Sequence, residues 1–98
     1  MNMKNIIIQA KKMQKDIEKS QKELEDKIYE GESQLVSVKM NGKGKIVSVN
    51  VNMENFSSDD KEILEDMILI AINNAVDKVE SDKEEKFGKY GKMFNGLM

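Results

Sequence analysis

Apolar and polar residues alternate with a period of two in only one part of the chain, residues 35–52, which read LVSVKMNGKGKIVSVNVN. This alternation is the pattern of a β-strand with one buried face. Between the two alternating runs lies the segment Asn41-Gly42-Lys43-Gly44, and an Asn-Gly pair tolerates the positive φ angles of a tight turn. We therefore predict an antiparallel hairpin over residues 35–52, against which the rest of the chain packs.

The register of this hairpin follows from the valines that must share its buried face. The apolar faces of the two strands coincide only if the numbers of paired residues have an odd sum, as when Val38 lies opposite Val47. A loop of two or four residues gives such pairs directly. A loop of three residues needs a bulge to restore the shared face, and we place that bulge at Gly44.

The segment before the hairpin has the spacing of an amphipathic helix from Met3 to about Lys27. Its apolar stripe consists of residues three or four positions apart, namely Met3, Ile6, Ala10, Met13, Ile17, Ser20 and Leu24. A helix of 24 residues is about 36 Å long, which is longer than the hairpin can cover. We expect part of it to project as an arm, although an ordinary core-facing helix with a solvated face is the simpler alternative.

A short segment, residues 28–33, joins this helix to the hairpin. It tolerates β structure and contains Gly31, so we predict a third strand at the sheet edge, with Gly31 marking a bulge or a close backbone approach. After the hairpin, Ser57 and Ser58 followed by two aspartates predict a helix start. The acids of this start also allow a cation site, but we favour their role as partners of the helix dipole.

A second helix is predicted from Lys61 to about Lys86. The run from Met67 to Ile72 is apolar on every side of this helix, and one small sheet can cover only one side. A second copy of the chain is the best cover for the remainder, and an unusually well-wrapped core helix is the alternative. The residues that we expect at the dimer interface are Leu64, Met67, Ile68, Ala71, Ile72 and Ala75.

Glycines 88, 91 and 96 should end the helix, so we divide the chain into a single domain over residues 1–86 and a flexible Lys/Gly-containing tail over residues 87–98.

The 98-residue chain contains no histidine and no cysteine, which excludes imidazole bases, thiolate nucleophiles and the usual zinc sites. We therefore expect no enzyme, no cofactor, no metal site and no small-molecule substrate. No run of about 18 apolar residues occurs, so we expect a cytoplasmic protein without a membrane partner. All sixteen basic residues are lysines, and bidentate reading of guanine is mostly the work of arginine.

The charges are unevenly distributed along the chain. Residues 1–27 carry a net charge of +2, residues 28–53 carry +1, residues 54–85 carry −8 and residues 86–98 carry +3. Only nearby charges are felt across a Debye length of about 8 Å, so the basic ends can bind a polyanion despite the acidic second helix. A solvated charged face is the competing interpretation.

Several local strings, in this order, resemble the YbaB/EbfC family of small bacterial nucleoid-associated proteins. They are QAKKMQ at residues 9–14, YEGES at 29–33, VKMNGKG at 38–44, LEDM at 64–67 and AINNA at 71–75. The chain departs from the family at Gln34, where a glycine-rich stretch is common, and in its tail, which lacks the usual proline. These departures concern loop length and the tail.

The resemblance implies an α+β fold with a long N-terminal helix, a three-stranded antiparallel sheet and a long C-terminal helix, assembled into a tweezer-like homodimer. It also implies that the protruding helices bind duplex DNA in the nucleoid. Phosphate contacts would come from the lysines of these helices, namely Lys4, Lys11, Lys12, Lys15, Lys19, Lys22, Lys86, Lys89 and Lys92. Such contacts are sensitive to salt and discriminate weakly between sequences. The alternative function is a dimeric adaptor that binds another protein without direct DNA contact.

Overall fold

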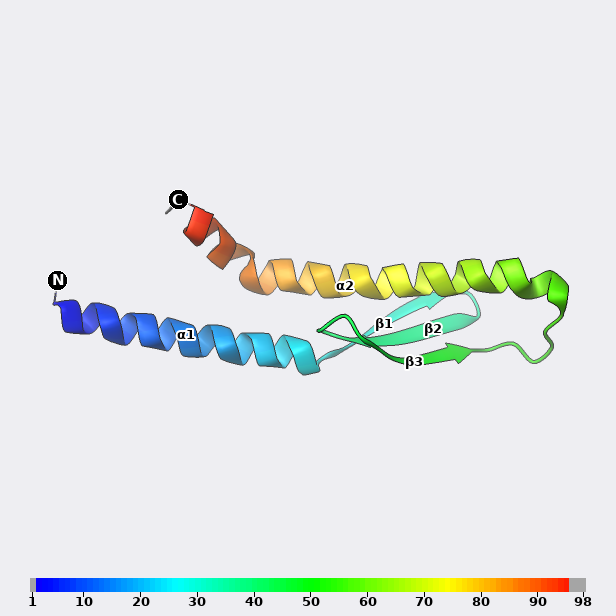
Figure 1. Cartoon of the computed structure of the whole chain (residues 1–98), viewed down its shortest axis with the longest axis horizontal. Coiled ribbons are helices and arrows are strands. Elements are labelled where there is room, and N and C mark those ends of the chain that lie inside the picture. Colours follow the sequence, from blue (N-terminus) through cyan, green and yellow to red (C-terminus); the bar gives the residue numbers. More distant parts are fainter. Residues whose placement is uncertain (1, 96–98) are drawn as a thin grey trace.

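The computed structural model describes the backbone of residues 2–95 and the side chains of residues 2–88. The elements follow one another along the chain as α1 (Met3–Asp26), β1 (Ile28–Ser33), β2 (Val36–Asn41), β3 (Ile46–Val51), a 3₁₀ turn η1 (Ser58–Asp60) and α2 (Lys61–Asn95) (Figure 1). The predicted α+β fold, with a helix, a three-stranded antiparallel sheet and a second long helix, is confirmed.

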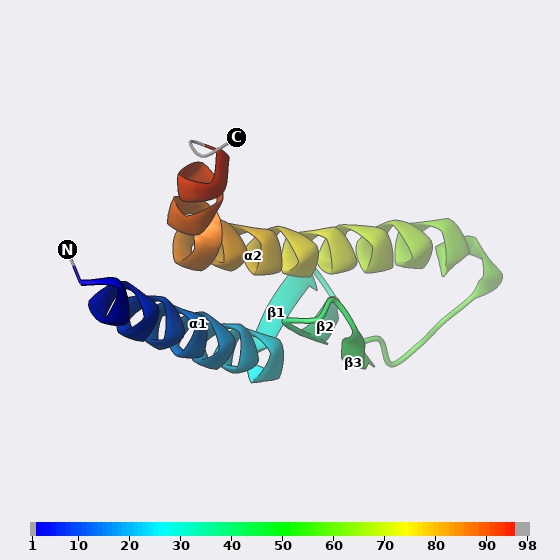
Figure 2. The same ribbon diagram turned by 60° about the vertical axis from the view of Figure 1, so that its left-hand side comes forward.

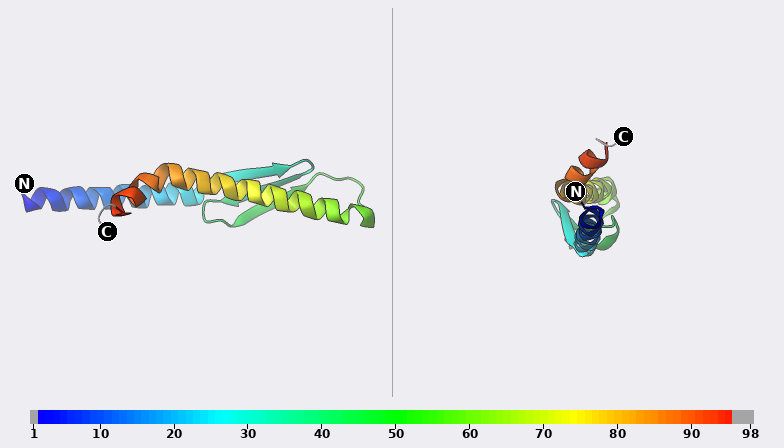
Figure 3. Two further views of the ribbon diagram at one scale, coloured as in Figure 1. Left: turned by 90° about the horizontal axis from the view of Figure 1, so that it is seen from above. Right: turned by 90° about the vertical axis from the view of Figure 1, so that its left-hand side faces the viewer.

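The molecule is elongated, with principal extents of 71 × 24 × 14 Å. α2 lies along the sheet, and both helices extend beyond the sheet in the same direction (Figures 1 and 2). The start of α1 and the end of α2 therefore lie toward the same end of the molecule. The view along the long axis shows α1, the sheet and most of α2 close to that axis, with the last turns of α2 turned away from it (Figure 3). The projecting arm predicted for the first helix is confirmed.

The sheet has the strand order β1-β2-β3, and all of its pairs are antiparallel. The valines share a face as predicted, but Val38 lies opposite Val49 rather than opposite Val47. The backbone amide of Asn41 donates to the carbonyl of Lys45, which closes a three-residue loop. The predicted bulge at Gly44 is present: Gly44 has a φ of +84°, its amide donates to the carbonyl of Asn41 at 3.0 Å, and Asn41 thus bonds to both Gly44 and Lys45. Contrary to the prediction, this bulge does not restore the shared valine face. A second irregularity does so between Lys39 and Met40, where Val47 is the extra residue.

The core lies between α2 and the first two strands. Val36, Val38 and Met40 of β2 are at most 2% exposed, and Ala71 and Ala75 of α2 are fully buried. Gly31 of β1 lies directly beneath these alanines: a Cβ at this position would stand 2.0 Å from the carbonyl oxygen of Ala71. Of the two alternatives predicted for Gly31, the structure shows the close backbone approach.

The outer edge of β1 is covered by polar side chains of α2. The Asn74 side-chain amide donates to the carbonyl oxygen of Glu32 at 2.9 Å, and the Lys78 ammonium donates to the carbonyl oxygen of Glu30 at 2.5 Å. These residues are four positions apart on one face of the helix. They satisfy edge carbonyls that would otherwise be free to pair with another strand.

The opposite edge strand, β3, is not covered by any of the residues that the structure describes. Val49 is 49% exposed and Val51 is 38% exposed, although both point to the same face as the buried valines of β2. The reason is that α2 lies over β1 and β2 only. The uncovered apolar face of β3 beside the helix, which contains Val49 and Val51, is called the apolar strip.

α2 begins at Lys61, as predicted, but ends later than predicted. The 3₁₀ turn η1, which leads into α2, is capped by Ser57, whose backbone amide donates to the carboxylate of Asp60 at 3.0 Å. At the end of α2, the prediction of a stop near Lys86 is wrong: the helix continues through Gly88 to Asn95. The last turns change direction relative to the rest of α2, which is where glycines are expected to permit a bend (Figures 1 and 2). The division into residues 1–86 and 87–98 stays a prediction, and residues 96–98 lie outside the described residues.

Candidate nucleic-acid interface

The distal half of α1 is exposed to solvent along its whole length. Asn2 caps the helix, since its side-chain oxygen accepts from the amide of Lys4 at 3.2 Å. Every described residue from Asn2 to Asp16 is exposed. Residues 2–15 contain four lysines and no acid. This half of the arm is therefore a solvated helix with a net charge of +4.

Four of the α1 lysines lie on one line along the helix. Successive residues of an α-helix are rotated by about 100°, so positions separated by 4, 7, 11 or 18 fall on nearly the same side. Lys12 and Lys19 stand beside this line. We call the line the lysine face, and its members are Lys4, Lys11, Lys15 and Lys22.

All six lysines predicted on α1 are exposed. Among the described residues, none of the six lies within ion-pair distance of a carboxylate. Their charges are thus available to an external anion. The six lysines are distributed over much of the circumference of α1. Four of them, the lysine face, lie on one side of the helix, where a single ligand can contact them together.

The root of the α1 arm is held by the hairpin loop. Leu24 is 2% exposed, and it is the only buried side chain of α1. Gly42 donates its backbone amide to the carbonyl of Glu25 at 3.2 Å, and a Cβ at Gly42 would stand 1.8 Å from the carbonyl oxygen of Leu24. The hairpin loop therefore acts as a rigid support for the last turn of the arm.

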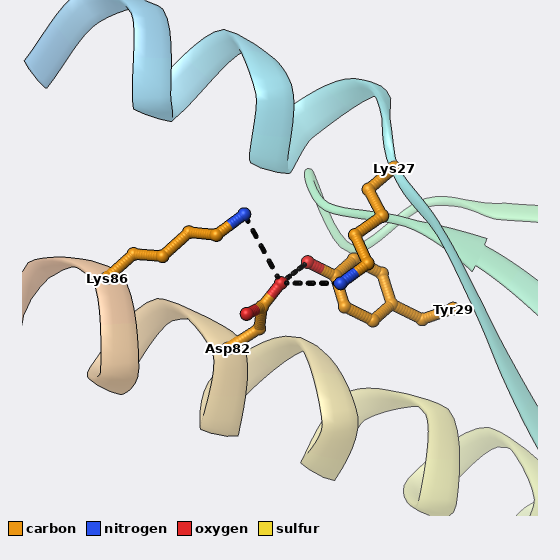
Figure 4. A network of polar contacts seen from close by, with 4 residues as sticks. All are labelled: Lys27, Tyr29, Asp82 and Lys86. Carbon is orange, nitrogen blue, oxygen red and sulfur yellow. Dashed lines mark hydrogen bonds and ion pairs between the residues drawn. The ribbon is translucent and has the colours of Figure 1, made fainter. Parts of the chain in front are cut away.

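A polar network joins the root of α1 to α2 (Figure 4). The hydroxyl of Tyr29, at the start of β1, donates to the carboxylate of Asp82 on α2. The same carboxylate oxygen lies 3.2 Å from the ammonium of Lys27 and 3.6 Å from that of Lys86. The Lys27 ammonium also lies 5.2 Å from the centre of the Tyr29 ring. One carboxylate thus connects the segment between α1 and β1 to the part of α2 that leaves the sheet.

The network changes the acidity of both of its hydrogen-bonded members. Burial, together with the hydrogen bond to Asp82 and the charge of that carboxylate, raises the pKa of Tyr29 to about 12. The hydrogen bond from Tyr29, helped by Lys27 and Lys86, lowers the pKa of the Asp82 carboxyl. At neutral pH the tyrosine is therefore a donor and the aspartate a charged acceptor.

The lysines predicted on α2 have a different setting from those on α1. Lys86 is only partly exposed and faces Asp82, so part of its charge is already neutralised within the chain. Lys89 and Lys92 lie on the last turns of α2, and their side chains are outside the described ones. These turns leave the sheet at the same end of the molecule as α1 (Figure 1).

A cleft of about 550 Å³ lies where α1, the hairpin loop and α2 meet. Its lining combines apolar side chains with two lysines that sequence reasoning did not select, and the lining residues are Ile17, Gln21, Leu24, Glu25, Gly42, Lys43, Lys83 and Phe87. The cleft lies between the C-terminal part of α1 and the part of α2 that leaves the sheet. Beyond the cleft, α1 and the last turns of α2 have separate surfaces.

The residues predicted at a dimer interface fall into two groups. Met67, Ala71 and Ala75 are at most 4% exposed, because they pack against the sheet of their own chain. Leu64, Ile68 and Ile72 are only partly buried. The second group borders the core cluster that contains Val36 and Val38, whose strand partners are the exposed Val51 and Val49. Of the predicted set, these three residues remain available to a second copy.

Sequence reasoning missed the network around Asp82 altogether. Its members come from distant parts of the chain, and acids within a charged helix give no local sign of such a role.

Within the described residues, no helix is long and apolar enough to cross a membrane.

Comparison with known proteins points to one family. The model of the YbaB/EbfC DNA-binding family matches residues 1–94. The chain is 34% identical to a nucleoid-associated protein of Ligilactobacillus salivarius, over 99% of this chain and 95% of that one. It is 40% identical to a nucleoid-associated protein of Caldanaerobacter subterraneus, over 96% of this chain and 86% of that one.

Among solved structures, an uncharacterized protein from Helicobacter pylori has the same fold. The TM-score is 0.66 at 23% identity, and the match covers 100% of this chain and 99% of that one. Together with the matching family model and the relatives above, this likeness extends over nearly the whole chain. The chain belongs to the YbaB/EbfC DNA-binding family.

Proposed function

We propose that this protein is a non-enzymatic, nucleoid-associated protein that binds duplex DNA as a homodimer through its basic helical arms. The observation that carries the proposal is the distal half of α1, where residues 2–15 are exposed and hold four lysines without a single acid. An isolated helix of this kind has no structural use for so much unpaired positive charge. A phosphate backbone is the natural partner, because lysines displace its condensed counterions.

The contacts proposed are mainly phosphate contacts with low sequence specificity. Lysine acts as a point charge on a flexible stem, whereas bidentate base reading needs arginine, which this chain lacks. The lysine face would contact the backbone directly, and Lys12 and Lys19 would support it. Lys89 and Lys92 would contribute from α2, and Lys86 would contribute less because Asp82 already holds it.

The proposed homodimer uses the uncovered apolar strip of the sheet. Val49 and Val51 are exposed beside the partly buried Leu64, Ile68 and Ile72 of α2. β1 is protected by Asn74 and Lys78, whereas no helix and no side chain among the described residues covers β3 in this way. A second copy placed on this strip would bury the valines and leave both α1 arms free to form the two limbs of a tweezer.

A gel-shift titration with duplex DNA at several salt concentrations tests this function. We expect binding that weakens steeply as salt rises, and little binding by a variant with Lys11, Lys12 and Lys15 replaced by glutamate. Absence of duplex binding at low salt, or equal binding by the variant, would refute the proposal. Recovery of a stoichiometric protein partner after nuclease treatment, without DNA binding, would favour the adaptor function instead.

A further inference from the structure

Three consecutive isoleucines near the start of α1 have no partner in the described part of the chain. Ile6 is 48% exposed, Ile7 is 50% exposed and Ile8 is 56% exposed. Of these three isoleucines, only Ile6 belongs to the apolar stripe that ends at the buried Leu24. Because successive residues are about 100° apart, Ile8 points to the side of the helix opposite Ile6, and Ile7 points to the flank between the two sides.

The side opposite Ile6 is the lysine face. Ile8 is four residues after Lys4, and Ile7 is four residues before Lys11, so both isoleucines are neighbours of lysines along the same line. A helix surface that serves only to attract phosphates gains nothing from exposed β-branched apolar side chains. The distal part of the lysine face therefore combines charge with an apolar contact surface.

A polyanion with recessed apolar surface fits this combination. The major groove of B-form DNA is about 12 Å wide, and an α-helix with its side chains is about 10–12 Å across. Phosphates line both walls of the groove, whereas the thymine methyl groups lie on its floor. A helix that enters with Ile7 and Ile8 facing inward keeps the flexible lysine stems free to reach outward to the walls.

We propose that the tip of α1 lies in the major groove of duplex DNA, with Ile7 and Ile8 packed against thymine methyl groups and neighbouring lysines on the phosphates. This inference rests on the proposed DNA-binding function and adds the groove, the contacting side chains and a modest preference for thymine. The isoleucine contacts do not displace counterions, so they contribute affinity that persists as salt rises.

The test compares a double variant, Ile7→Gln with Ile8→Gln, with the single variant Ile6→Gln. Glutamine keeps helix propensity and charge, and Ile6 has a similar exposure on the side of the same turn that lies opposite the lysine face. Fluorescence anisotropy would give the Kd for an A·T-rich duplex and for the same duplex with uracil in place of thymine. Uracil removes only the methyl group from the groove.

We expect the wild-type protein and the Ile6 variant to bind the thymine duplex several-fold more tightly than the uracil duplex. The double variant should bind the thymine duplex about tenfold more weakly than the wild type, with an unchanged salt slope and no preference for thymine. Circular dichroism would verify that α1 remains helical in each variant.

Equal affinity of the double variant and the wild type would overturn the proposal, as would a wild-type protein that does not distinguish the two duplexes. Loss in the double variant of self-association or of binding to phosphatidylglycerol vesicles, with DNA affinity unchanged, would overturn it in favour of a second copy or a lipid surface. A wild-type protein that binds neither duplex at low salt would refute the DNA-binding function itself.

Discussion

The Tyr29 hydroxyl donates a hydrogen bond to the Asp82 carboxylate and so joins the first strand to α2 across 53 residues of sequence. Lys27 and Lys86 flank the same carboxylate oxygen. The four residues surround the point at which both helices leave the sheet (Figure 4). The direction of one arm relative to the other is therefore fixed by a buried phenol and a single acid, in addition to the packing of Leu24.

Replacing Tyr29 by phenylalanine should lower the free energy of unfolding by about 1–2 kcal/mol, because a hydrogen bond to a charged acceptor is lost while the ring stays buried. Urea denaturation followed by circular dichroism measures the change. Lys61→Gln is the matched control: its ion pair with Glu65 is exposed and 4.0 Å long, so the loss should stay below about 0.5 kcal/mol. Equal effects of the two substitutions would contradict the role of the network.

The same hydrogen bond predicts how stability depends on alkaline pH. The pKa of Tyr29 is raised to about 12 in the folded chain, against about 10 for an unfolded tyrosine. Because the folded value is the higher one, this contribution to stability is fully present below about pH 10 and is lost as the pH rises through about 12. We expect the difference in unfolding free energy between the wild type and Tyr29→Phe to shrink across this interval. A constant difference would contradict the assignment.

Gly31→Ala should destabilise the protein by about 3 kcal/mol or more, because a Cβ at this position would stand 2.0 Å from the Ala71 carbonyl oxygen and 2.5 Å from the Ala75 amide nitrogen. Thermal unfolding measures the loss. Gly44→Asn is the comparison: open space surrounds Gly44, and asparagine tolerates its positive φ, so that change should cost less than about 1 kcal/mol. A well-tolerated alanine at Gly31 would mean that α2 does not approach β1 so closely.

Val49→Lys should give a monomer in place of the proposed dimer, because it places a charge in the centre of the uncovered apolar strip. Val49 is 49% exposed within one chain, so the substitution should leave the protomer folded. Light scattering at micromolar concentration gives the mass. The adjacent Ser48→Lys, which points to the opposite face of β3, should remain a dimer. A wild-type protein of monomeric mass would refute the proposed assembly.

The sequence was sufficient to predict the elements, the shared valine face and the projecting arm, because each depends on local periodicity. It did not predict the extra residue at Val47, which restores the shared valine face after the loop with its bulge at Gly44. It also ended α2 too early: glycines such as Gly88 lower helix propensity by only about 1 kcal/mol each, which the flanking helix can tolerate.

The candidate site was predictable in kind but not in detail. The sequence identified the exposed lysines of α1, yet their common line with Ile7 and Ile8 becomes clear only once the helix is seen to be unpartnered. The half-buried state of Lys86 could not be predicted, because its partner Asp82 is one of eleven acids in residues 54–85. Contacts between elements distant in sequence leave no local pattern.

The salt dependence of duplex binding is the most direct measurement of the proposed function. Fluorescence anisotropy on one duplex, from low to moderate salt, gives the slope of log K against log salt for the wild type and for Lys11→Gln with Lys15→Gln. Each lost phosphate contact should reduce the slope by about 0.9, so the double variant should lose about 1.8 per arm engaged. Lys39→Gln with Lys45→Gln, on the hairpin, should leave the slope unchanged. A wild type without duplex binding at low salt, or equal slopes for all three proteins, would contradict binding through the α1 arm.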